Sequence, residues 1–259
     1  MTVKNSTVDY EVKGHVAYIT MNRPDKLNAI NAQMRAELMT AFRDVSENSA
    51  VRLAVYTGAG RAFSTGHDLS ESMEPGATPG RGSASLDHLY LYLSEIGKPI
   101  IGAINGTCLA QGAALALLTD IKIATPNASF GWPQAKLGLT SISGPSIASE
   151  YFPVNVAMNA LFTGEPISAG DALRFGAVNE IVPQESLRDY VDELARAISS
   201  NAPLAISGMK QAVLLGRGMS LRQRIEIAGL ISERASTSED QAEGLRAYAE
   251  GRRPVFVGR

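Results

Sequence analysis

The sequence feature that most restricts the fold is a strand and a helix that recur along the first half of the chain. Apolar runs typical of buried strands occupy residues 52–57, 99–105 and 120–124, and helical patterns at 31–45, 86–96 and 112–118 alternate with them. The period is on the order of 50 to 60 residues, which indicates stacked copies of one supersecondary unit. We therefore predict an α/β fold in which successive β-β-α turns form a spiral.

The two ends of the chain depart from this pattern. Residues 8–12 and 15–21 alternate apolar and polar side chains, which predicts an antiparallel hairpin. Helical patterns follow one another later, at 157–162, 169–175, 186–200, 203–215, 221–235 and 239–250. Because such short helices cannot easily form a core of their own, we expect a core over residues 1–200. A helical region over 201–259 would pack on this core and on neighbouring subunits.

Composition and charge exclude several classes of protein. The net charge is -2 and the Lys and Arg residues are dispersed, which disfavours nucleic-acid binding. The longest apolar run, 109–118, is interrupted by Gln111 and is too short to cross a membrane. Cys108 is the only cysteine and has no neighbour at metal-ligand spacing. We expect a cytoplasmic protein without membrane insertion and without a metal site.

Two glycine-marked junctions, at residues 62–69 and 105–114, follow strands and precede helices. The carboxyl ends of parallel strands are where α/β proteins bind ligands, and helix starts offer backbone N–H groups to an oxygen with partial negative charge. Small residues at Gly66, Gly112 and Ala113 would let a ligand approach the backbone. The pattern predicts a site for one carbonyl oxygen, and tight packing of helix on strand is an equally good interpretation of the glycines alone.

The segment 74–85 contains three glycines and two prolines. This composition predicts a mobile loop beside whatever site lies near His67, in a position to act as a lid.

The ordered motifs of the whole chain resemble the crotonase, or enoyl-CoA hydratase/isomerase, superfamily. They include Asn22-Arg23-Pro24, Asn28-Ala29, Ala62 to Asp68, Lys98-Pro99, Asn105-Gly106, Asp120, Phe130 to Pro133, Thr163-Gly164, Gly176 to Asn179, Lys210, Ser238 to Asp240 and Pro254 to Phe256. The resemblance implies a ββα spiral core, a C-terminal region used for trimerisation, and a trimer or a hexamer. It also implies an acyl-CoA substrate, with coenzyme A entering as part of that substrate and no prosthetic group.

The same resemblance implies roles for individual residues. The backbone N–H of Thr65 and that of Gln111, with Gly112 as a weaker alternative, would form an oxyanion hole for the thioester carbonyl. Phe256 would reach the ligand of a neighbouring subunit. Contacts with the adenine and pantetheine groups are implied for Lys26, Leu27, Ala29, Ala62, Ser64, Gly66, Asp68 and Leu69.

The catalytic positions depart from the family pattern. Hydratases of the family use two glutamates, and this chain has Ala114 and Gln134 in their places. Ala114 cannot transfer a proton, and Gln134 can only hold a water or a carbonyl group by hydrogen bonds. Hydration by the two-carboxylate mechanism is therefore not expected.

Three functions remain open from the sequence. The first is an enzyme of the hydratase/isomerase type that works through the oxyanion hole, with protons moved by water held at Gln134 or by His67. The second is an acyl-CoA binding protein without turnover. The third resembles methylmalonyl-CoA decarboxylase, whose motif His67 matches, although Ser141 stands where that branch has a tyrosine. A residue of the turn whose backbone serves the ligand is the favoured role for His67.

Overall fold

The computed structural model describes residues 6–72 and 81–259. Its larger sheet has six strands in the order β1-β2-β3-β5-β7-β10. β1 and β2 form the expected antiparallel hairpin, and the other neighbours are parallel. The strands are β1 (Val8–Lys13), β2 (Val16–Met21), β3 (Leu53–Gly58), β5 (Ile100–Ile104), β7 (Ile121–Ala124) and β10 (Glu180–Ile181).

A second sheet of four short strands lies in the order β4-β6-β8-β9. They are β4 (Ala62–Ser64), β6 (Thr107–Leu109), β8 (Ser129–Gly131) and β9 (Ile167–Ser168). Along the chain β3 is followed by β4, β5 by β6 and β7 by β8, so each turn adds one strand to each sheet before the next helical segment. The predicted ββα spiral is thereby confirmed. The short strands escaped prediction because two or three residues are too few to show a period.

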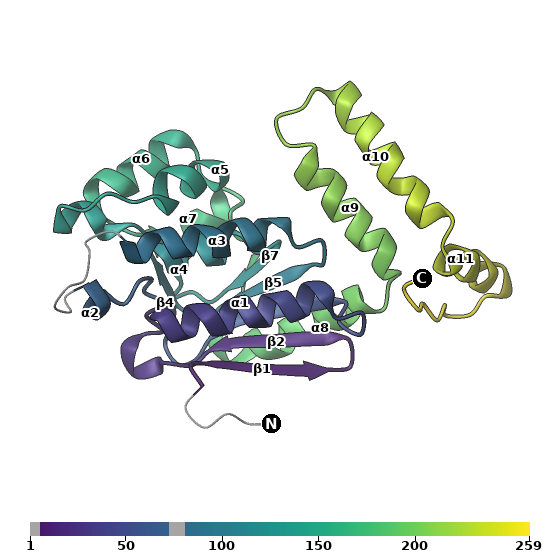
Figure 1. Ribbon diagram of the computed structural model, residues 1–259, viewed down its shortest axis with the longest axis horizontal. Helices are drawn as coiled ribbons and strands as arrows, with labels where there is room; N and C mark the ends of the chain where they lie inside the picture. Colours follow the sequence, from purple (N-terminus) through teal and green to yellow (C-terminus); the bar gives the residue numbers. More distant parts are fainter. Residues whose placement is uncertain (1–5, 73–80) are drawn as a thin grey trace.

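Helices cover both faces of the larger sheet (Figure 1). Asn31 caps α1 (Ala32–Glu47), and its side chain accepts a hydrogen bond from the Met34 amide at 2.9 Å. Together with α3 (Arg81–Glu95) and α4 (Gln111–Leu117), α1 encloses the main core. On the opposite face α8 (Leu187–Ser199) packs on a smaller core. The alternation of side chains along β3 serves both cores, since its residues point to the two faces in turn.

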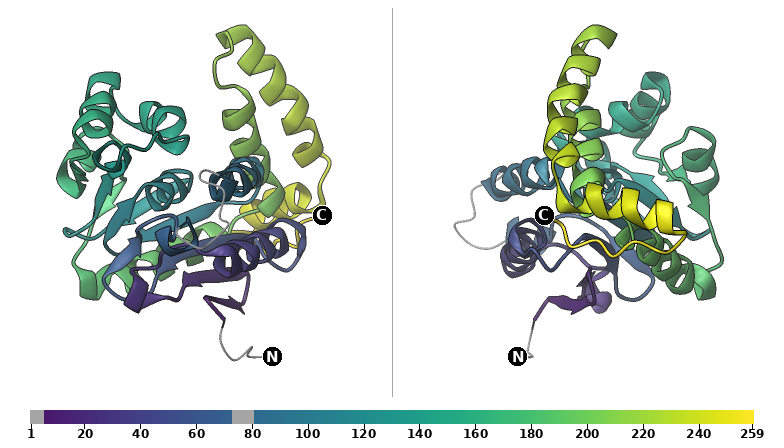
Figure 2. Two further views of the ribbon diagram at one scale, coloured as in Figure 1. Left: turned by 60° about the vertical axis from the view of Figure 1, so that its left-hand side comes forward. Right: turned by 90° about the vertical axis from the view of Figure 1, so that its right-hand side faces the viewer.

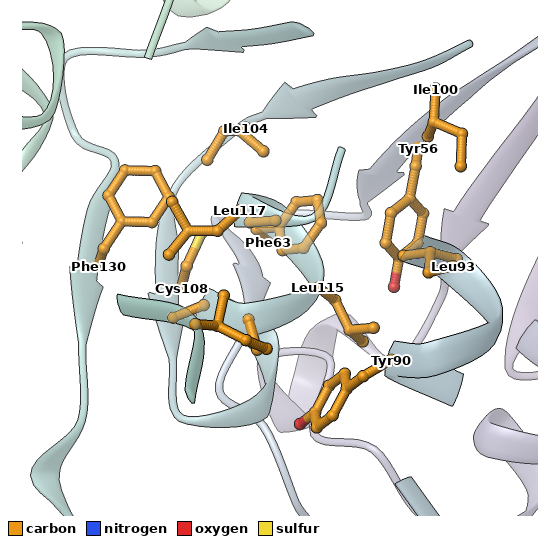
Figure 3. Packing of buried hydrophobic residues seen from close by; sticks show 14 of the residues in the cluster. Tyr56, Phe63, Tyr90, Leu93, Ile100, Ile104, Cys108, Leu115, Leu117 and Phe130 are labelled. Carbon is orange, nitrogen blue, oxygen red and sulfur yellow. The ribbon is translucent and has the colours of Figure 1, made fainter. Parts of the chain in front are cut away.

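Aromatic rings and small residues fill the main core (Figure 3). The rings of Phe42 and Phe63 both meet Tyr56 edge to face, with centroids 5.2 and 5.1 Å apart. Cys108 is fully buried, and burial raises the pKa of its thiol well above the usual value. Cys108 therefore serves as a small apolar residue of the core.

The expected loop at 74–85 falls in part on residues 73–80, which lie outside the described chain. Residues 81–85 were wrongly assigned to the loop, since they belong to α3. Gly82 costs a helix only about 1 kcal/mol relative to alanine, which elongation from the following residues can overcome.

Shorter helical segments connect these elements and complete the C-terminal half. They are η1 (Pro24–Lys26), α2 (Leu69–Ser72), η2 (Pro133–Leu137), the π-helix η3 (Gly144–Ala148), α5 (Ser149–Tyr151), α6 (Val154–Thr163), α7 (Ala169–Arg174) and η4 (Gln184–Ser186). In the described part of the chain, no helix combines the length and the apolar character that a membrane span requires.

The C-terminal helices α9 (Pro203–Leu215) and α10 (Leu221–Ser236) form a hairpin that projects from the body of the molecule (Figures 1 and 2). α11 (Glu239–Glu250) then returns toward the sheet. One side chain fastens the base of the hairpin: Lys210 donates to Asp120 Oδ2 at 2.6 Å and to the Lys98 carbonyl oxygen at 2.9 Å. The rest of the hairpin extends beyond the core.

Candidate active site

The two glycine-marked junctions meet at the carboxyl ends of β4 and β6, as predicted. A Cβ atom placed on Gly66 would lie 2.8 Å from the Leu109 carbonyl oxygen and 3.0 Å from the Gln111 amide nitrogen. A Cβ atom on Gly112 would lie 2.3 Å from the Ser64 carbonyl oxygen. Only glycine allows the two backbones to approach this closely. We call this region, residues 64–67 and 109–112, the cradle.

The segment that precedes α1 orients the first side of the cradle. The Ile30 amide donates to the Gly66 carbonyl oxygen at 2.7 Å, and the Ile30 carbonyl accepts from the Asp68 amide at 3.1 Å. In such a parallel pairing the N–H of the intervening residue, His67, points to the other side of the strand. That side carries β6, which pairs with β4 and leads into α4.

The expectation for Thr65 needs correction on this evidence. Its amide donates to the Leu27 carbonyl oxygen at 3.1 Å, on the side of the strand away from β6. Thr65 and His67 are two residues apart, so simple alternation would point their N–H groups the same way, but Gly66 between them has φ +85° and interrupts the extended chain. We therefore replace the Thr65 amide by the His67 amide of the same turn as the candidate donor.

The second side of the cradle is held by a strained residue. Ala110 has φ 51° and ψ -115°, a conformation that costs a residue with a Cβ atom about 1–3 kcal/mol. Its amide donates to the Gly131 carbonyl oxygen at 2.7 Å. The next residue, Gln111, is the first of α4, so its N–H has no carbonyl partner within the helix. The strained turn aims this N–H into the cradle.

A buried asparagine connects the backbone segments next to the cradle. Asn28 has φ 54° and no exposed surface, and its Nδ2 donates to the carbonyl oxygens of Ala59 and Ala62 at 2.9 and 2.8 Å. Ser64 Oγ in turn donates to the Asn28 carbonyl oxygen at 2.8 Å and accepts from the Gly66 amide at 3.1 Å. We did not assign Asn28 to the site from the sequence. A short polar side chain that tolerates positive φ is the signal that could have found it.

One wall of the site is polar but uncharged. Gln134 Nε2 donates to Ser141 Oγ at 3.4 Å, and Ser141 Oγ lies 3.4 Å from Ser143 Oγ. Ser143 Oγ then donates to the Ala110 carbonyl oxygen at 3.5 Å, so the chain of contacts ends at the cradle. The Ser141 hydroxyl is fixed by the Gly144 amide, which donates to it at 2.9 Å. Sequence reasoning did not recognise this role of Ser141 and Ser143, because their spacing matches no motif.

Three polar atoms near this wall are buried without a hydrogen-bond partner among the described residues. They are Gln111 Oε1, Trp132 Nε1 and Gln134 Oε1. Buried polar groups are nearly always paired, so unpaired ones gathered beside a turn of strained backbone indicate a place where a ligand or water binds. Ala114, in contrast, is fully buried in the apolar core.

His67 is half-buried, and burial lowers the pKa of its imidazole below the usual value. Glu71 and Asp68 raise this pKa and Arg35 lowers it, so the net effect favours the neutral ring at pH 7. Asp68 itself is structural: it forms an ion pair with Arg23 at 2.8 Å and accepts hydrogen bonds from Ser70. The hydrogen bonds from Ser70 make Asp68 a cap of the turn that leads into α2.

The residues expected to contact coenzyme A are only partly brought together. Ala62 and Ser64 are buried in β4, and Gly66 and Gly112 form the cradle. Lys26 and Leu27 lie at the end of η1, Ala29 lies before α1, Asp68 is paired with Arg23, and Leu69 is half-exposed at the start of α2. Phe256 packs beside Gly244 of α11, at the other end of the molecule from α2 (Figure 1). Within one chain it takes no part in the site.

Comparisons with known proteins agree with this architecture. The sequence model of the family described as Enoyl-CoA hydratase/isomerase matches residues 11–259. The chain belongs to the enoyl-CoA hydratase/isomerase family. It is 38% identical over 258 residues to (E)-benzylidenesuccinyl-CoA hydratase of Thauera aromatica, a match that covers 97% of this chain and 99% of that protein. It is also 34% identical to short-chain-enoyl-CoA hydratase of Clostridium acetobutylicum, with 96% of each chain covered.

Solved structures of the family share the fold. The crystal structure of an enoyl-CoA hydratase/isomerase from Mycobacterium paratuberculosis superposes with a TM-score of 0.86 at 34% identity, covering 98% of this chain and 99% of that one. The ββα spiral and the C-terminal helices are therefore those of the enoyl-CoA hydratase/isomerase family.

Proposed function

We propose that this member of the family binds an acyl-CoA thioester with the thioester oxygen between the backbone N–H groups of His67 and Gln111. The contact between the two backbones at Gly66 and Gln111 carries this proposal, because it brings two strand-to-helix junctions within reach of one atom. The two donors would stabilise the enolate that forms when the carbonyl is polarised. Loss of one such donor typically costs about 3 kcal/mol of transition-state stabilisation.

The reaction that we propose is the addition of water to a 2-enoyl thioester, or its reverse. Water supplies hydroxide to C3 and a proton to C2, and the enolate is the intermediate. The unpaired Gln134 Oε1 would accept a hydrogen bond from that water, and Ser141 fixes the orientation of the amide. Because a glutamine has no usable pKa, this wall orients water without acting as a base. The hydratases among the similar proteins support the reaction class.

Mass spectrometry of thioesters incubated with the purified protein tests the proposal. The panel consists of crotonyl-, 3-enoyl-, aryl- and methylmalonyl-CoA, with binding followed in parallel. We expect crotonyl-CoA to gain the mass of one water. Tight binding with every thioester unchanged would instead identify an acyl-CoA binding protein, and loss of carbon dioxide from methylmalonyl-CoA would identify a decarboxylase.

The Gln134→Glu change should raise the rate of crotonyl-CoA hydration by about tenfold or more. Glutamate has nearly the same shape as glutamine and can take a proton from the water, and general bases contribute at least this factor. Rates measured across pH should also show a new decline at acidic pH, where the introduced carboxylate becomes protonated. Gln184→Glu, an exposed position in η4, serves as the control and should change neither property. An unchanged rate in Gln134→Glu would place the water elsewhere.

We further propose that the chain assembles into a homotrimer or a hexamer of two trimers. Large apolar side chains with 57–68% exposure lie along the α9–α10 hairpin, among them Met209, Val213, Leu215, Ile225 and Leu230. Soluble monomers rarely leave so many apolar side chains exposed on one feature. A cavity of about 530 Å³ between α9 and the sheet adds to this uncovered side.

Sedimentation velocity should show the wild-type chain as an oligomer, and Val213→Glu should weaken its association by about tenfold or more. A charge buried in an apolar interface without a partner is costly. Tyr190→Glu on α8, also at an exposed large hydrophobic residue, is the control and should leave the oligomer intact. A monomeric wild-type chain at micromolar concentration would exclude the proposal.

A further inference from the structure

An incompletely paired arginine lies beside the cradle. The side chain of Arg35, on the second turn of α1, is only 15% exposed. Its Nη2 is 3.8 Å from Glu71 Oε2, at the outer limit of an ion pair. Its Nη1 is buried and has no hydrogen-bond partner within residues 6–72 and 81–259. A guanidinium is always charged, so an open donor on a buried one is costly unless a ligand completes it.

A second arginine, at the start of η1, has two close hydrogen-bond acceptors. Arg23 Nη1 donates to Asp68 Oδ2 at 2.8 Å and to the Ala29 carbonyl oxygen at 2.5 Å. Glu71, the partner of Arg35, has a second contact. Its Oε1 accepts a hydrogen bond from the Ala32 amide at 2.6 Å, at the start of α1. The carboxylate nearest to Arg35 is therefore largely committed to the helix terminus, and the positive charge is compensated only in part.

Arg35 lies near His67 of the cradle, where the acyl group would bind. α1 begins two residues after Ile30, which pairs with His67, and Glu71 of α2 follows His67 by four residues. The guanidinium is close enough to His67 for its charge to lower the pKa of the imidazole. His67 in turn supplies one side of the cradle. An acyl group that extends from the cradle along this turn would approach the guanidinium.

We infer that Arg35 binds a carboxylate on the acyl group, so that the preferred thioesters are half-thioesters of dicarboxylic acids. This inference rests on the proposed function and names its substrate class. A carboxylate fits the planar fork of a guanidinium, and a charge-assisted bond to a buried donor is among the stronger polar contacts. Gln134, Ser141 and Ser143, which form the polar wall, carry no charge that would compete for the anion.

Calorimetric titration of the full-length protein with succinyl-CoA and butyryl-CoA tests this inference. Both acyl groups have four carbon atoms and differ in the terminal carboxylate. We expect the wild-type chain to bind succinyl-CoA about tenfold more tightly than butyryl-CoA. In Arg35→Gln the two affinities should become equal through loss of succinyl-CoA affinity alone. Arg43→Gln, an exposed position on the same helix, removes the same charge and should preserve the preference.

The outcomes separate this inference from the proposed function. If the wild-type chain binds butyryl-CoA but shows no preference for succinyl-CoA, or if Arg35→Gln retains the preference, Arg35 is not a carboxylate site. If neither thioester binds, both the proposed acyl-CoA function and this inference are wrong. Circular dichroism checks the fold of Arg35→Gln, and Arg35→Lys, which keeps the charge without the fork, should show a preference between those of the other two proteins.

Discussion

Gly66→Ala should lower kcat for crotonyl-CoA by about 100-fold or more. Gly66 has φ +85°, and the added methyl group would lie 3.0 Å or less from the Leu109 carbonyl oxygen and the Gln111 amide nitrogen. The β6–α4 turn would have to move away from β4, and the two N–H groups could no longer reach one oxygen. Stopped-flow or steady-state measurement of hydration by the folded variant gives the result.

Gly176→Ala separates the effect on the cradle from backbone strain. Gly176 has φ +76° after α7, is exposed, and has open space where a Cβ atom would stand. The substitution imposes the same strain, about 1–2 kcal/mol, with no steric contact. Hydration should then continue at the wild-type rate. An equal loss of activity in both variants would mean that strain, and not the shape of the cradle, explains the first result.

Gly112→Ala should destabilise the protein by about 3 kcal/mol or more, or prevent folding. Its methyl group would stand 2.3 Å from the Ser64 carbonyl oxygen and 2.8 Å from Ser64 Cβ. Backbone cannot rotate aside as a side chain can, so the cost exceeds that of ordinary overpacking. For a chain of this size such a loss lowers the melting temperature by roughly 10 °C, which differential scanning calorimetry measures.

Gly170→Ala is the matched control, because Gly170 is also the second residue of a helix, α7. The nearest atom to its added methyl group would be Ser168 Oγ at 3.9 Å, an ordinary contact. Alanine also suits a helix better than glycine, so the melting temperature should stay the same or rise slightly. A Gly112→Ala protein as stable as Gly170→Ala would show that the two junctions do not pack as described.

Much of the fold could be predicted because its main elements are long and periodic. The strands that begin at Leu53 and Ile100 and the helix capped by Asn31 each carry enough residues to reveal burial on one or two faces. The second sheet could not be predicted in the same way. Its strands are stabilised by pairing with strands about 20 to 45 residues away along the chain, and nothing within three residues reveals that pairing.

The candidate site, too, could be predicted from the sequence only in part. Glycines at two strand ends predicted a close approach of the two junctions, although they fitted tight packing of helix on strand equally well. They could not show which amide points inward, because this depends on the pairing with Ile30 and on the positive φ of Gly66. The contacts of Ser141 and Arg35 depend on residues 7 to 36 positions away, so their roles emerge only from the three-dimensional arrangement.

The infrared absorption of a ¹³C-labelled thioester carbonyl tests the central claim most directly. With ¹³C=O crotonyl-CoA or a slowly reacting analogue bound to the wild-type protein, two N–H donors should polarise the carbonyl and move its stretching band to lower frequency than in water. In Gly66→Ala the band should return toward its position for the free thioester. A thioester that binds tightly to the wild-type protein with an unshifted carbonyl band would contradict the account.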